Sequence, residues 1–438
     1  MGDEALRQGW AFAAPEAETG KQGLVVGAGP SGLSAAYHLR RMGHGVTVME
    51  AGDKPGGMMR FGIPKYRLPR DVLDAEVARI AATGVTFRFG VKVTDMASAM
   101  AEVHADAAFL TIGAHIAKRA YIPAKDSARI LDAISVLRSM EGADKPMLGC
   151  RVVVYGGGNT AIDVARTARR LGTTDALIVY RQTREKMSAH DFELEEPLEE
   201  GVRVKWLSTI TGAEGGRLTI EKMVLNAEGN PEPTGEFEVL EADSLVLALG
   251  QDVDMQLLST IPGQMATDGV VQVDPETMMT SHPGLFAGGD MAPGERNVTV
   301  AIGHGKRAAR HIDVWLKSAV LVPKPDAKLA SFDRLNTWYY SDAPKTIRPQ
   351  LDLAKRQSSF DEVQGGLTET TALFEARRCL SCGNCFECDN CYGVCPDNAV
   401  IKLGPGNRFT INLDYAKGCG ICASECPGGA IEMVLEER

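Results

Sequence analysis

Apolar and polar positions alternate in blocks along the early part of the chain. Residues 23–26 form a short apolar run, which predicts a strand, and residues 33–42 can form a helix. Residues 46–49 form a second apolar run that ends at Glu50. A glycine-rich stretch, 27–32, separates the first run from the helix. The pattern therefore predicts a strand–turn–helix–strand unit of the α/β type.

A later segment repeats this plan. It predicts a strand over 151–155, a glycine turn over 156–160, a helix over 161–171 and a strand over 176–180. Two further apolar runs, at 244–249 and 284–287, lie too far along the chain to belong to a compact second unit. We therefore expect the second unit to be inserted into the first, which resumes near residue 245.

The first turn has the spacing G-x-G-x-x-G. The first glycine permits the tight turn, the second lets the backbone approach a pyrophosphate, and the third allows close strand–helix packing. Glu50 stands where an acid can bind ribose hydroxyls. We therefore expect a dinucleotide site here. Its predicted contacts are Gly27, Ala28, Gly29, Pro30, Ser31, Gly32, Glu50 and Ala51.

The second turn has alanine, Ala161, in the third glycine position, which the fingerprint allows. No acid ends the following strand. Arg181 and Arg184 stand there instead, and arginine can meet a 2′-phosphate, which favours NADP over NAD. The alternative is that both are solvated surface arginines, so the choice of nicotinamide stays open. The predicted contacts are Gly156, Gly158, Asn159, Thr160, Arg181 and Arg184.

Two dinucleotide sites in one chain indicate a flavin and a nicotinamide held face to face. A short strand that ends in Gly288-Gly289-Asp290 supports FAD in the first site, because it places a carboxylate near the ribityl chain. A helix over 298–310 follows, and its N-terminus can stabilise a reduced flavin. Within it, His304 fits a packed or exposed residue better than a catalytic one. The predicted contacts here are Gly250, Gly289, Asp290 and Val298.

The segment Gly57-Met58-Met59-Arg60-Phe61-Gly62-Ile63-Pro64, followed by Tyr66-Arg67-Leu68-Pro69, resembles the flavin-contact segment of the glutamate synthase small-subunit family. The stretch 156–161 with Asp163, and then Tyr180-Arg181 and Met187, resembles its NADPH domain. The resemblance covers about 21–315 and implies FAD, a nicotinamide and an oxidoreductase activity. Gln182 and Ser188 depart from the family pattern, which usually has arginine and proline there. The flavin contacts implied are Gly57, Met58, Arg60, Gly62 and Ile63.

Nine of the ten cysteines lie between residues 379 and 426. Cys385-x2-Cys388-x2-Cys391-x3-Cys395-Pro396 matches the bacterial ferredoxin run, and Cys419-x2-Cys422-x3-Cys426-Pro427 repeats it. We expect a ferredoxin-like domain with two [4Fe–4S] clusters. A structural zinc site is the alternative, but no histidine lies nearby. A disulfide scaffold would need an oxidising compartment, which nothing in the sequence indicates.

One position breaks the repeat, because Ala416 stands where a cysteine is expected. In two-cluster ferredoxins, the last cysteine of each run binds the other cluster. Cys385, Cys388, Cys391 and Cys426 are therefore expected to hold one cluster. Cys395, Cys419 and Cys422 are left for the other. Its fourth ligand is Cys379 or Cys382, Asp414 or water, or the site holds [3Fe–4S]. The two spare thiols favour a completed cube. Residues 377–382 also resemble cysteine segments elsewhere in glutamate synthase relatives, so the alternative role of Cys379 and Cys382 is to shape the domain junction.

The remaining features exclude several classes of protein. No run approaches the ~18 apolar residues of a membrane span, and the acidic N-terminus is unlike a secretory signal. A net charge of −10 argues against nucleic acid. A disulfide reductase needs paired cysteines beside the flavin, and Cys150, which we expect to be a small buried residue, is alone. We therefore expect a cytoplasmic protein.

These observations combine into one expected organisation. The domains predicted are an N-terminal extension over 1–20, an FAD domain over 21–120 and 245–320, an NAD(P) domain over 121–244, a wrapping connector over 321–376 and a ferredoxin-like domain over 377–438.

We expect a subunit that moves electrons between NAD(P)(H) and a protein partner. Flavin subunits that resemble this chain and carry a C-terminal ferredoxin domain occur in complexes that oxidise 2-oxoacids such as phenylglyoxylate, so this is the expected context. The alternatives are an NADPH electron donor of the glutamate synthase type and a relay subunit that no longer binds nicotinamide.

Overall fold

The structure is a computed structural model that describes residues 2–118, 120, 122–123, 129–187, 191–261, 266–319 and 330–435. The chain forms two compact units, each described by itself below. The first unit comprises Met1–Leu321 and Leu351–Val363, and the second comprises Val322–Gln350 and Gln364–Arg438. Ser188 and the rest of 188–190 lie outside the described residues. No described helix has the length and apolar character that crossing a membrane requires.

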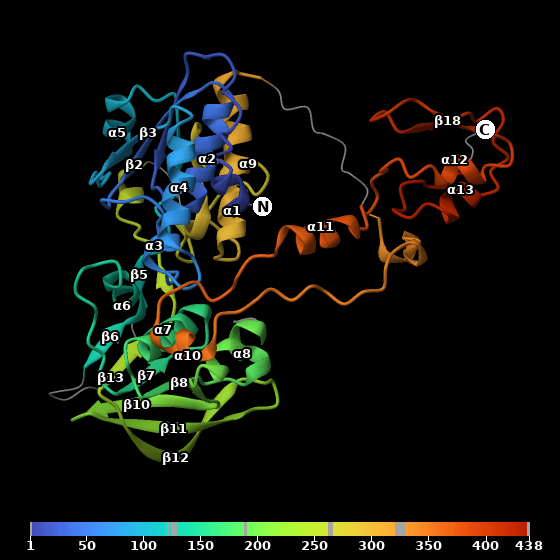
Figure 1. Ribbon diagram of the computed structural model, residues 1–438. Helices are drawn as coiled ribbons and strands as arrows, with labels where there is room; N and C mark the ends of the chain where they lie inside the picture. The colour runs from blue at the N-terminus through green and yellow to red at the C-terminus, as the bar shows by residue number, and fades with distance from the viewer. Residues whose placement is uncertain are drawn as a thin grey trace. The chain divides into compact units, whose positions relative to one another are not determined.

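The first unit contains two lobes, each built on a five-stranded parallel sheet (Figure 1). In the first lobe the strand order is β17 (Leu285–Ala287), β4 (Ala107–Leu110), β1 (Gln22–Val26), β2 (Gly45–Glu50) and β3 (Thr86–Phe89). The helices of this lobe are α1 (Gly2–Arg7), α2 (Pro30–Arg41), α3 (Met58–Phe61), α4 (Arg70–Ala81), α5 (Met96–Glu102) and α9 (Val298–Leu316).

Close packing of α2 against α9 covers one face of the first sheet. Ala35, Ala36, Ala308 and Ala309 are fully buried in this core, so two backbones approach each other over small side chains. Gly305 is required here, because a Cβ at this position would lie 2.1 Å from the carbonyl oxygen of Ser31. This contact fixes the start of α2 relative to α9.

The sheet of the second lobe has the strand order β6 (Ile130–Asp132), β13 (Ser244–Leu247), β7 (Arg151–Tyr155), β8 (Asp175–Val179) and β9 (Arg203–Lys205). Its helices are α6 (Ala133–Ser139), α7 (Asn159–Arg170), α8 (Asp191–Glu199) and α10 (Leu353–Ser358). An antiparallel sheet packs on its other face and consists of β10 (Ser208–Glu214), β11 (Arg217–Leu225) and β12 (Pro231–Glu241).

The assignment of the apolar run at 244–249 needs a correction. We expected it to return the chain to the first sheet, but β13 lies in the second sheet between β6 and β7, with Ser244 opposite Val152. An apolar run in a parallel sheet does not reveal which of two sheets it joins. The chain crosses back later, where β14 (Gln251–Asp252) pairs with β5 (Ile116–Ala117).

A thirteen-residue strap, residues 351–363, belongs to the first unit although its neighbours on both sides belong to the second. Its helix α10 packs against α7, as Figure 1 shows in orange against green. The Val363 N–H donates to the carbonyl of Tyr66 at 2.9 Å, and the Leu351 N–H donates to the carbonyl of Val363 at 2.9 Å.

The second unit is small and carries the nine clustered cysteines. Its regular elements are α11 (Glu369–Arg377), α12 (Asn390–Val394), α13 (Ile421–Ser424) and the hairpin of β18 (Val400–Lys402) with β19 (Phe409–Ile411). Before α12 and α13 stands a residue in the left-handed region, Asp389 with φ 67° and Gly420 with φ 77°. The two cysteine runs therefore begin their short helices in the same way.

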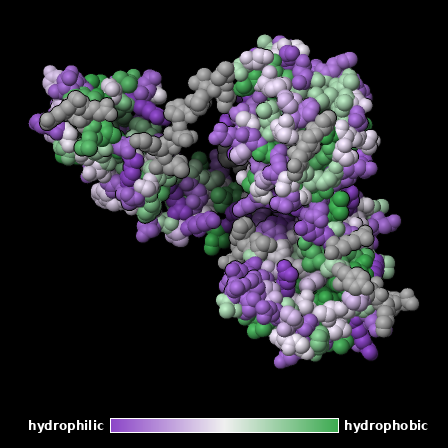
Figure 2. Space-filling model, turned by 180° about the vertical axis from the view of Figure 1, so that it is seen from behind, coloured by the Kyte–Doolittle hydropathy of each residue, from purple (hydrophilic) through white to green (hydrophobic). Residues whose placement is uncertain are grey.

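The α/β class with two dinucleotide-type sheets is confirmed, and the predicted strands and helices around both glycine turns are present. A remaining antiparallel pair in the first unit joins β15 (Ala266–Thr267) and β16 (Val270–Val271). The side chains of Asp191 and Phe192 are not described. Figure 2 shows hydrophobic and hydrophilic side chains mixed over the visible face of the chain.

Candidate functional site

The first glycine turn joins the end of β1 to the start of α2. Gly27 has φ +106°, and a Cβ there would lie 2.4 Å from the carbonyl oxygen of Thr111. A Cβ on Gly32 would lie 2.0 Å from the carbonyl oxygen of Gly27. Only glycine therefore fits at both positions, and the turn holds the N-terminus of α2 at the carboxyl edge of the sheet.

Glu50, at the end of β2, closes this turn. Its carboxylate accepts hydrogen bonds from the N–H of Ala28 at 2.7 Å and from the N–H of Gly52 at 2.8 Å. Two amide donors hold the carboxylate at the edge of the sheet, where an acid in this fold binds ribose hydroxyls.

A cavity of about 1390 Å³ opens above the turn and is lined by both lobes. It contains most of the predicted flavin contacts, although their roles stay predictions. Those that line it are Gly27, Gly29, Pro30, Ser31, Glu50, Ala51, Gly57, Met58, Gly62, Ile63, Gly289, Asp290 and Val298. A volume of this size accommodates a dinucleotide.

Four predicted flavin contacts do not line the cavity. Ala28 faces Glu50, and Gly32 packs beneath the turn. Arg60 is buried, with its guanidinium bonded to the carbonyl of Pro55 and to Asp74, so its charge is used within the protein. Gly250 lies exposed on the way to β14.

The oxygen Oγ of Ser31 fits a bound cofactor. It is buried at the start of α2 and has no hydrogen-bond partner within the described residues. Buried hydroxyls are normally paired, so an unpaired one that lines a cavity indicates a ligand that supplies the partner. The N-terminus of α2 also lacks a capping side chain, since Gly29 occupies the N-cap. Phosphate oxygens suit both groups.

The Gly289-Asp290 turn is held by a histidine. The Gly289 N–H donates to Nδ1 of the buried His304 at 3.2 Å, so this ring packs and positions the turn, as expected of a packed histidine. Burial raises the pKa of Asp290, and the nearby Arg296 and His115 oppose this effect. The helix α9 then begins at Val298, capped by the side chain of Asn297, which accepts from the Val300 N–H at 2.8 Å.

The second turn has a similar backbone conformation, but the residues around it are more exposed. Gly156 has φ +147°, and a Cβ there would lie 2.2 Å from the carbonyl oxygen of Ala248. Of the predicted nicotinamide contacts, Asn159 and Thr160 line the cavity. Gly156, Gly158, Arg181 and Arg184 do not.

Both arginines of the second turn are exposed. They lie on the loop after β8, which is held by a hydrogen bond from the Tyr180 hydroxyl to the carbonyl of Lys186 at 2.9 Å. On the same loop, Oε1 of Gln182 is buried without a hydrogen-bond partner within the described residues. The loop therefore presents cations and an unpaired amide close to the second turn.

Several charged residues that line the cavity were missed as site residues, and three of them form a bridge between the lobes. Arg67, from the first lobe, donates to both carboxylate oxygens of Asp163 at 3.0 Å and to Glu193 at 2.5 Å, both in the second lobe. Burial raises the pKa of Asp163 to about 6, although Arg67 opposes the shift. Arg67 and Asp163 stand in the segments that carry the family resemblance, and this resemblance was the only indication in the sequence that they belong to the site.

Behind this bridge, Tyr66 is fully buried against the guanidinium groups of Arg166 and Arg170, which lie 4.9 and 3.8 Å from its ring centre. Both arginines form ion pairs with Glu200, which is fully buried. Burial raises the pKa of the Tyr66 hydroxyl, which therefore stays protonated. The loop that follows α3 is thus anchored in the second lobe.

The strap completes this anchoring. Arg356 forms an ion pair with Glu199 at 2.8 Å, and the side-chain amide of Gln357 donates to the carbonyl of Glu200 at 3.0 Å.

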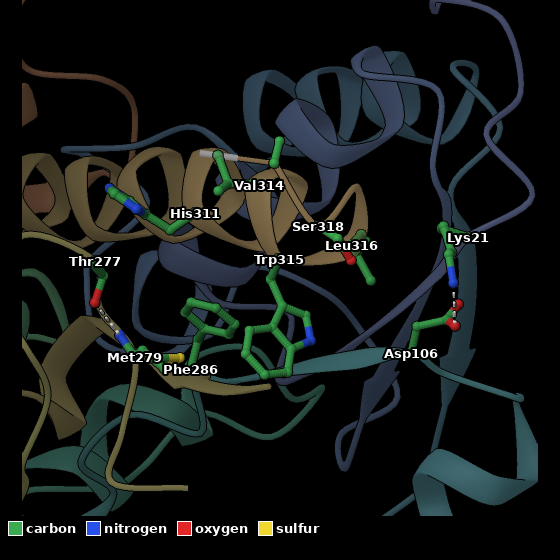
Figure 3. A pocket seen from close by; sticks show the side chains of 11 residues that line it. Lys21, Asp106, Thr277, Met279, Phe286, His311, Val314, Trp315, Leu316 and Ser318 are labelled. Carbon is green, nitrogen blue, oxygen red and sulfur yellow. Dashed lines mark hydrogen bonds and ion pairs between the residues drawn. The ribbon is translucent and has the colours of Figure 1, made fainter. Parts of the chain in front are cut away.

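A second, smaller cavity of about 620 Å³ lies at the far end of α9 and contains none of the predicted site residues (Figure 3). Trp315 and Phe286 form its apolar wall, and Lys21 pairs with Asp106 at 3.1 Å beside it.

Cys150 is exposed, contrary to expectation, because it lies in the turn before β7 and not in the strand. Among the described residues, no cysteine lines either cavity.

The clustered cysteines fall into two groups. Burial raises the pKa of Cys391 to about 11, and the thiols of Cys385, Cys388 and Cys426 beside it act in the same direction. Burial also raises the pKa of Cys422, with the thiols of Cys419 and Cys395 nearby. These two groups are the ones expected if the last cysteine of each run binds the other cluster. The ligand roles themselves stay predictions.

Backbone amides point at two of these sulfurs. The Ala399 N–H donates to Sγ of Cys395 at 3.2 Å, and the Ala430 N–H donates to Sγ of Cys426 at 3.3 Å. Burial alone would raise the pKa of Cys395, but its amide donors lower it overall. Such bonds favour thiolate, the form that binds iron. Within the described residues, no three potential ligands lie close enough to bind one metal ion. Each cysteine of an iron–sulfur cluster binds a different iron atom, so a cluster does not require such a convergence.

Two parallel-sheet lobes with a glycine turn each and a shared cavity define the class as an oxidoreductase that holds two dinucleotides. The sequence profile described as pyridine nucleotide-disulphide oxidoreductase matches residues 21–305, and the chain belongs to this family. Accordingly it is an NAD(P)H-dependent oxidoreductase with sites for FAD and NAD(P), and its C-terminal cysteines fit iron–sulfur clusters.

Similar proteins include subunit beta of the NADP(+)-dependent formate dehydrogenase of Moorella thermoacetica, with 36% identity over 83% of this chain and 55% of the relative. Subunit beta of the NADPH-Fe(3+) oxidoreductase of Geobacter sulfurreducens is 31% identical over 84% of this chain and 62% of the relative. The chain therefore spans little more than half the length of these two proteins.

The expected resemblance to glutamate synthase small subunits is confirmed. The Escherichia coli glutamate synthase [NADPH] small chain is 30% identical over 72% of this chain and 73% of the relative. Among solved structures, Mycobacterium tuberculosis FprA in complex with NADPH has a similar fold, with a TM-score of 0.58, 18% identity, and coverage of 68% of this chain and 85% of that one.

Proposed function

We propose that this chain is an electron-transfer subunit that moves electrons between NADP(H) and a partner protein through FAD and two iron–sulfur clusters. One observation carries the proposal: a single cavity is lined by the first glycine turn and by the start of the helix after the second turn. Two dinucleotides bound at these turns would extend into a common space. When bound, FAD and the clusters would split the two-electron chemistry of a nicotinamide into single-electron steps.

The residues of the chain supply position and electrostatics. Ser31 and the N-terminus of α2 would bind the FAD pyrophosphate, and Glu50 would bind a ribose. Asn159 and Thr160, at the start of α7, face the cavity from the opposite lobe. Arg67 bridges the two lobes through Asp163 and so holds them in register. No side chain needs to act as a general base.

NADP(H) is the proposed nicotinamide. Arg181 and Arg184 are exposed on the loop after β8, where a 2′-phosphate would lie in this fold. Names of three relatives state NADP(+) or NADPH, which supports the same choice. The absence of cysteines from the cavity walls, among the described residues, supports electron transfer over disulfide reduction.

For the partner, we propose a catalytic core that oxidises 2-oxoacids in the cytoplasm. Its support is the combination of a flavin unit with a C-terminal cysteine unit in one chain, as in the complexes that the sequence resembles. The alternative is a glutamate synthase type of electron donor, which the similarity to small chains supports.

Anaerobic purification of the full chain tests the first proposal. We expect yellow flavin and brown iron–sulfur absorbance, and stopped-flow bleaching of the flavin that is at least tenfold more efficient with NADPH than with NADH. If neither nucleotide bleaches the flavin, the remaining hypothesis is a relay subunit that no longer binds nicotinamide. A protein without either chromophore would overturn the proposal.

Purification of the native complex tests the partner. Co-purifying subunits that reduce the chain with a 2-oxoacid and coenzyme A would support the 2-oxoacid core. A large amidotransferase would contradict it and favour glutamate synthesis.

A further inference from the structure

The two cysteine runs of the second unit are built alike except at one ligand position. Both place a cysteine in a short helix, Cys391 in α12 and Cys422 in α13, and both end in a Cys-Pro pair whose sulfur accepts a hydrogen bond from an amide N–H. Cys385 opens the first run, but its counterpart in the second is Ala416. Whether the second site is complete therefore depends on where the spare thiols lie.

Cys379 and Cys382 lie on the side of the complete group. Their loop is bonded to the residues directly after Cys426, since the Gly383 N–H donates to the carbonyl of Gly428 at 2.6 Å. The backbone is tight at this contact, because a Cβ on Gly428 would lie 3.1 Å from the carbonyl oxygen of Asn384.

A second set of contacts holds this loop in place. The Tyr340 hydroxyl donates to the carbonyl of Leu380, between the two spare cysteines, at 3.1 Å. Nearby, the Asn336 N–H donates to the carbonyl of Pro427 at 3.3 Å. These contacts thus hold the loop of the spare cysteines beside the residues that follow Cys426, and Cys426 belongs with Cys385, Cys388 and Cys391.

Beside the other group, one acid and the backbone at the missing position are held by contacts of their own. Asp397, two residues after Cys395, forms an ion pair with Lys417 at 2.7 Å, so its charge is already balanced. Ala416 itself is fixed by a bond from its N–H to the carbonyl of Asn412 at 3.0 Å, and the Asp414 N–H donates to the side chain of the same Asn412. The missing thiolate is replaced by a methyl group on a fixed backbone.

We propose that Cys395, Cys419 and Cys422 hold a three-iron [3Fe–4S] cluster, and that Cys379 and Cys382 are not its ligands. This rests on the proposed function, because it requires clusters in the second unit. Three thiolates match the three irons of such a cluster, and a cube would leave one iron without a protein ligand. The two clusters then differ in type, and so in reduction potential.

Electron paramagnetic resonance of the full chain, purified without oxygen and without added iron, tests the proposal. Oxidised three-iron clusters are paramagnetic and oxidised [4Fe–4S] cubes are not, so the oxidised chain is expected to show about one three-iron signal and about seven irons per chain. In Ala416→Cys the signal is expected to disappear and the iron content to rise to about eight. Ala416→Val is the matched control and retains the signal.

The double variant Cys379→Ser with Cys382→Ser tests the position of the spare thiols. It is expected to retain the three-iron signal at wild-type intensity. A wild-type chain with two cubes and no three-iron signal, or a signal that arises only on exposure to air, would overturn the proposal. A wild-type cube that the double variant converts into a three-iron cluster would also overturn it, because the spare thiols would then be ligands.

Failure of this inference is distinguishable from failure of the proposed function. Two complete cubes in a yellow-brown protein that NADPH reduces would remove only the three-iron assignment. Absence of iron and flavin together would remove both.

Discussion

The two glycine turns have nearly the same backbone, and they differ in how exposed the residues at the start of the following helix are. At the first turn, Gly27, Ala28 and Ser31 are buried, and the cavity is lined by the loop after β2, by α3 and by the start of α9. At the second turn, Asn159 is exposed and Arg181 lies on an exposed loop. The difference matches what the two cofactors must do: one stays bound through many reaction cycles, and the other must leave after each.

The helices that follow the turns are packed by different means. α2 packs on α9 through small apolar residues such as Ala35 and Ala308. α7 instead carries Arg166 and Arg170 on its buried side, paired with Glu200 and crossed by the strap. Both lobes have an apolar core, but the packing of α7 also depends on buried charges that must remain paired.

The largest effect is expected at the turns themselves. Gly27→Ala should reduce bound FAD at least tenfold, because the added methyl group meets the Thr111 carbonyl at 2.4 Å. Gly156→Ala is equally crowded, with 2.2 Å to the Ala248 carbonyl, but should retain FAD and lose reduction by NADPH. The ratio of flavin to protein absorbance measures bound FAD in both variants, and bleaching of the flavin by NADPH measures the reduction, with circular dichroism as the folding control. Loss of FAD from both variants would show that the lobes are not separate binding units.

The next effect concerns the buried charges. Glu200→Gln should lower the free energy of unfolding by about 3–5 kcal/mol, because two arginines are left buried with one fewer negative charge. Asp175→Asn, which breaks an exposed pair with Arg203, should cost about 1 kcal/mol or less. Urea unfolding measures both free energies, and similar costs would contradict the dependence of the second lobe on its buried ion pairs.

A pH effect is expected from the bridge between the lobes. The pKa of Asp163 is about 6 in the folded protein, above its ordinary value of 3.8, because burial disfavours the carboxylate. The folded state therefore holds the proton more tightly, and this contribution to stability is lost as pH rises from about 4 to about 6. The loss is at most about 3 kcal/mol. Asp163→Asn should flatten the profile of melting temperature against pH in this window, and an unchanged slope would assign it to other groups.

The smallest effect is expected at the open loop of the second turn. Arg181→Ala should raise the KM for NADPH about tenfold, the equivalent of one charge-assisted hydrogen bond of about 1.4 kcal/mol, and should leave the KM for NADH within about twofold. Lys186→Ala, exposed on the same loop, is the matched control and should change neither. Equal effects of Arg181→Ala on both nucleotides would make this arginine a general contact and not a reader of the 2′-phosphate.

Local patterns in the sequence predicted the strands, helices and turns well, because the spacing of glycines and apolar runs is fixed by backbone geometry. Residues 244–249 were assigned to the wrong sheet, since an apolar run records burial but not its neighbour. A connector that wraps the body was expected over 321–376, but its contacts could not be placed, because Arg356 and Gln357 meet Glu199 and Glu200 across more than 150 positions of sequence.

The site residues divide in the same way. Residues near the glycine turns, such as Ser31 and Thr160, follow the motif and line the cavity, although their binding roles stay predictions. The side chain of Arg60, also a predicted flavin contact, is bonded to Pro55 and Asp74. Arg67 and Glu193 were missed, because their significance appears only when two lobes meet across the cavity.

The strap also sets a condition on any attempt to divide this chain. A flavin-binding fragment that ended at Leu321 would lack Arg356 and Gln357, and so would lose their bonds to Glu199 and to the Glu200 carbonyl. Conversely, an excised cysteine unit would have to bridge the gap between Gln350 and Gln364 with new residues. Exchange of the cysteine unit between related proteins would therefore succeed only if the thirteen residues of the strap remain with the recipient.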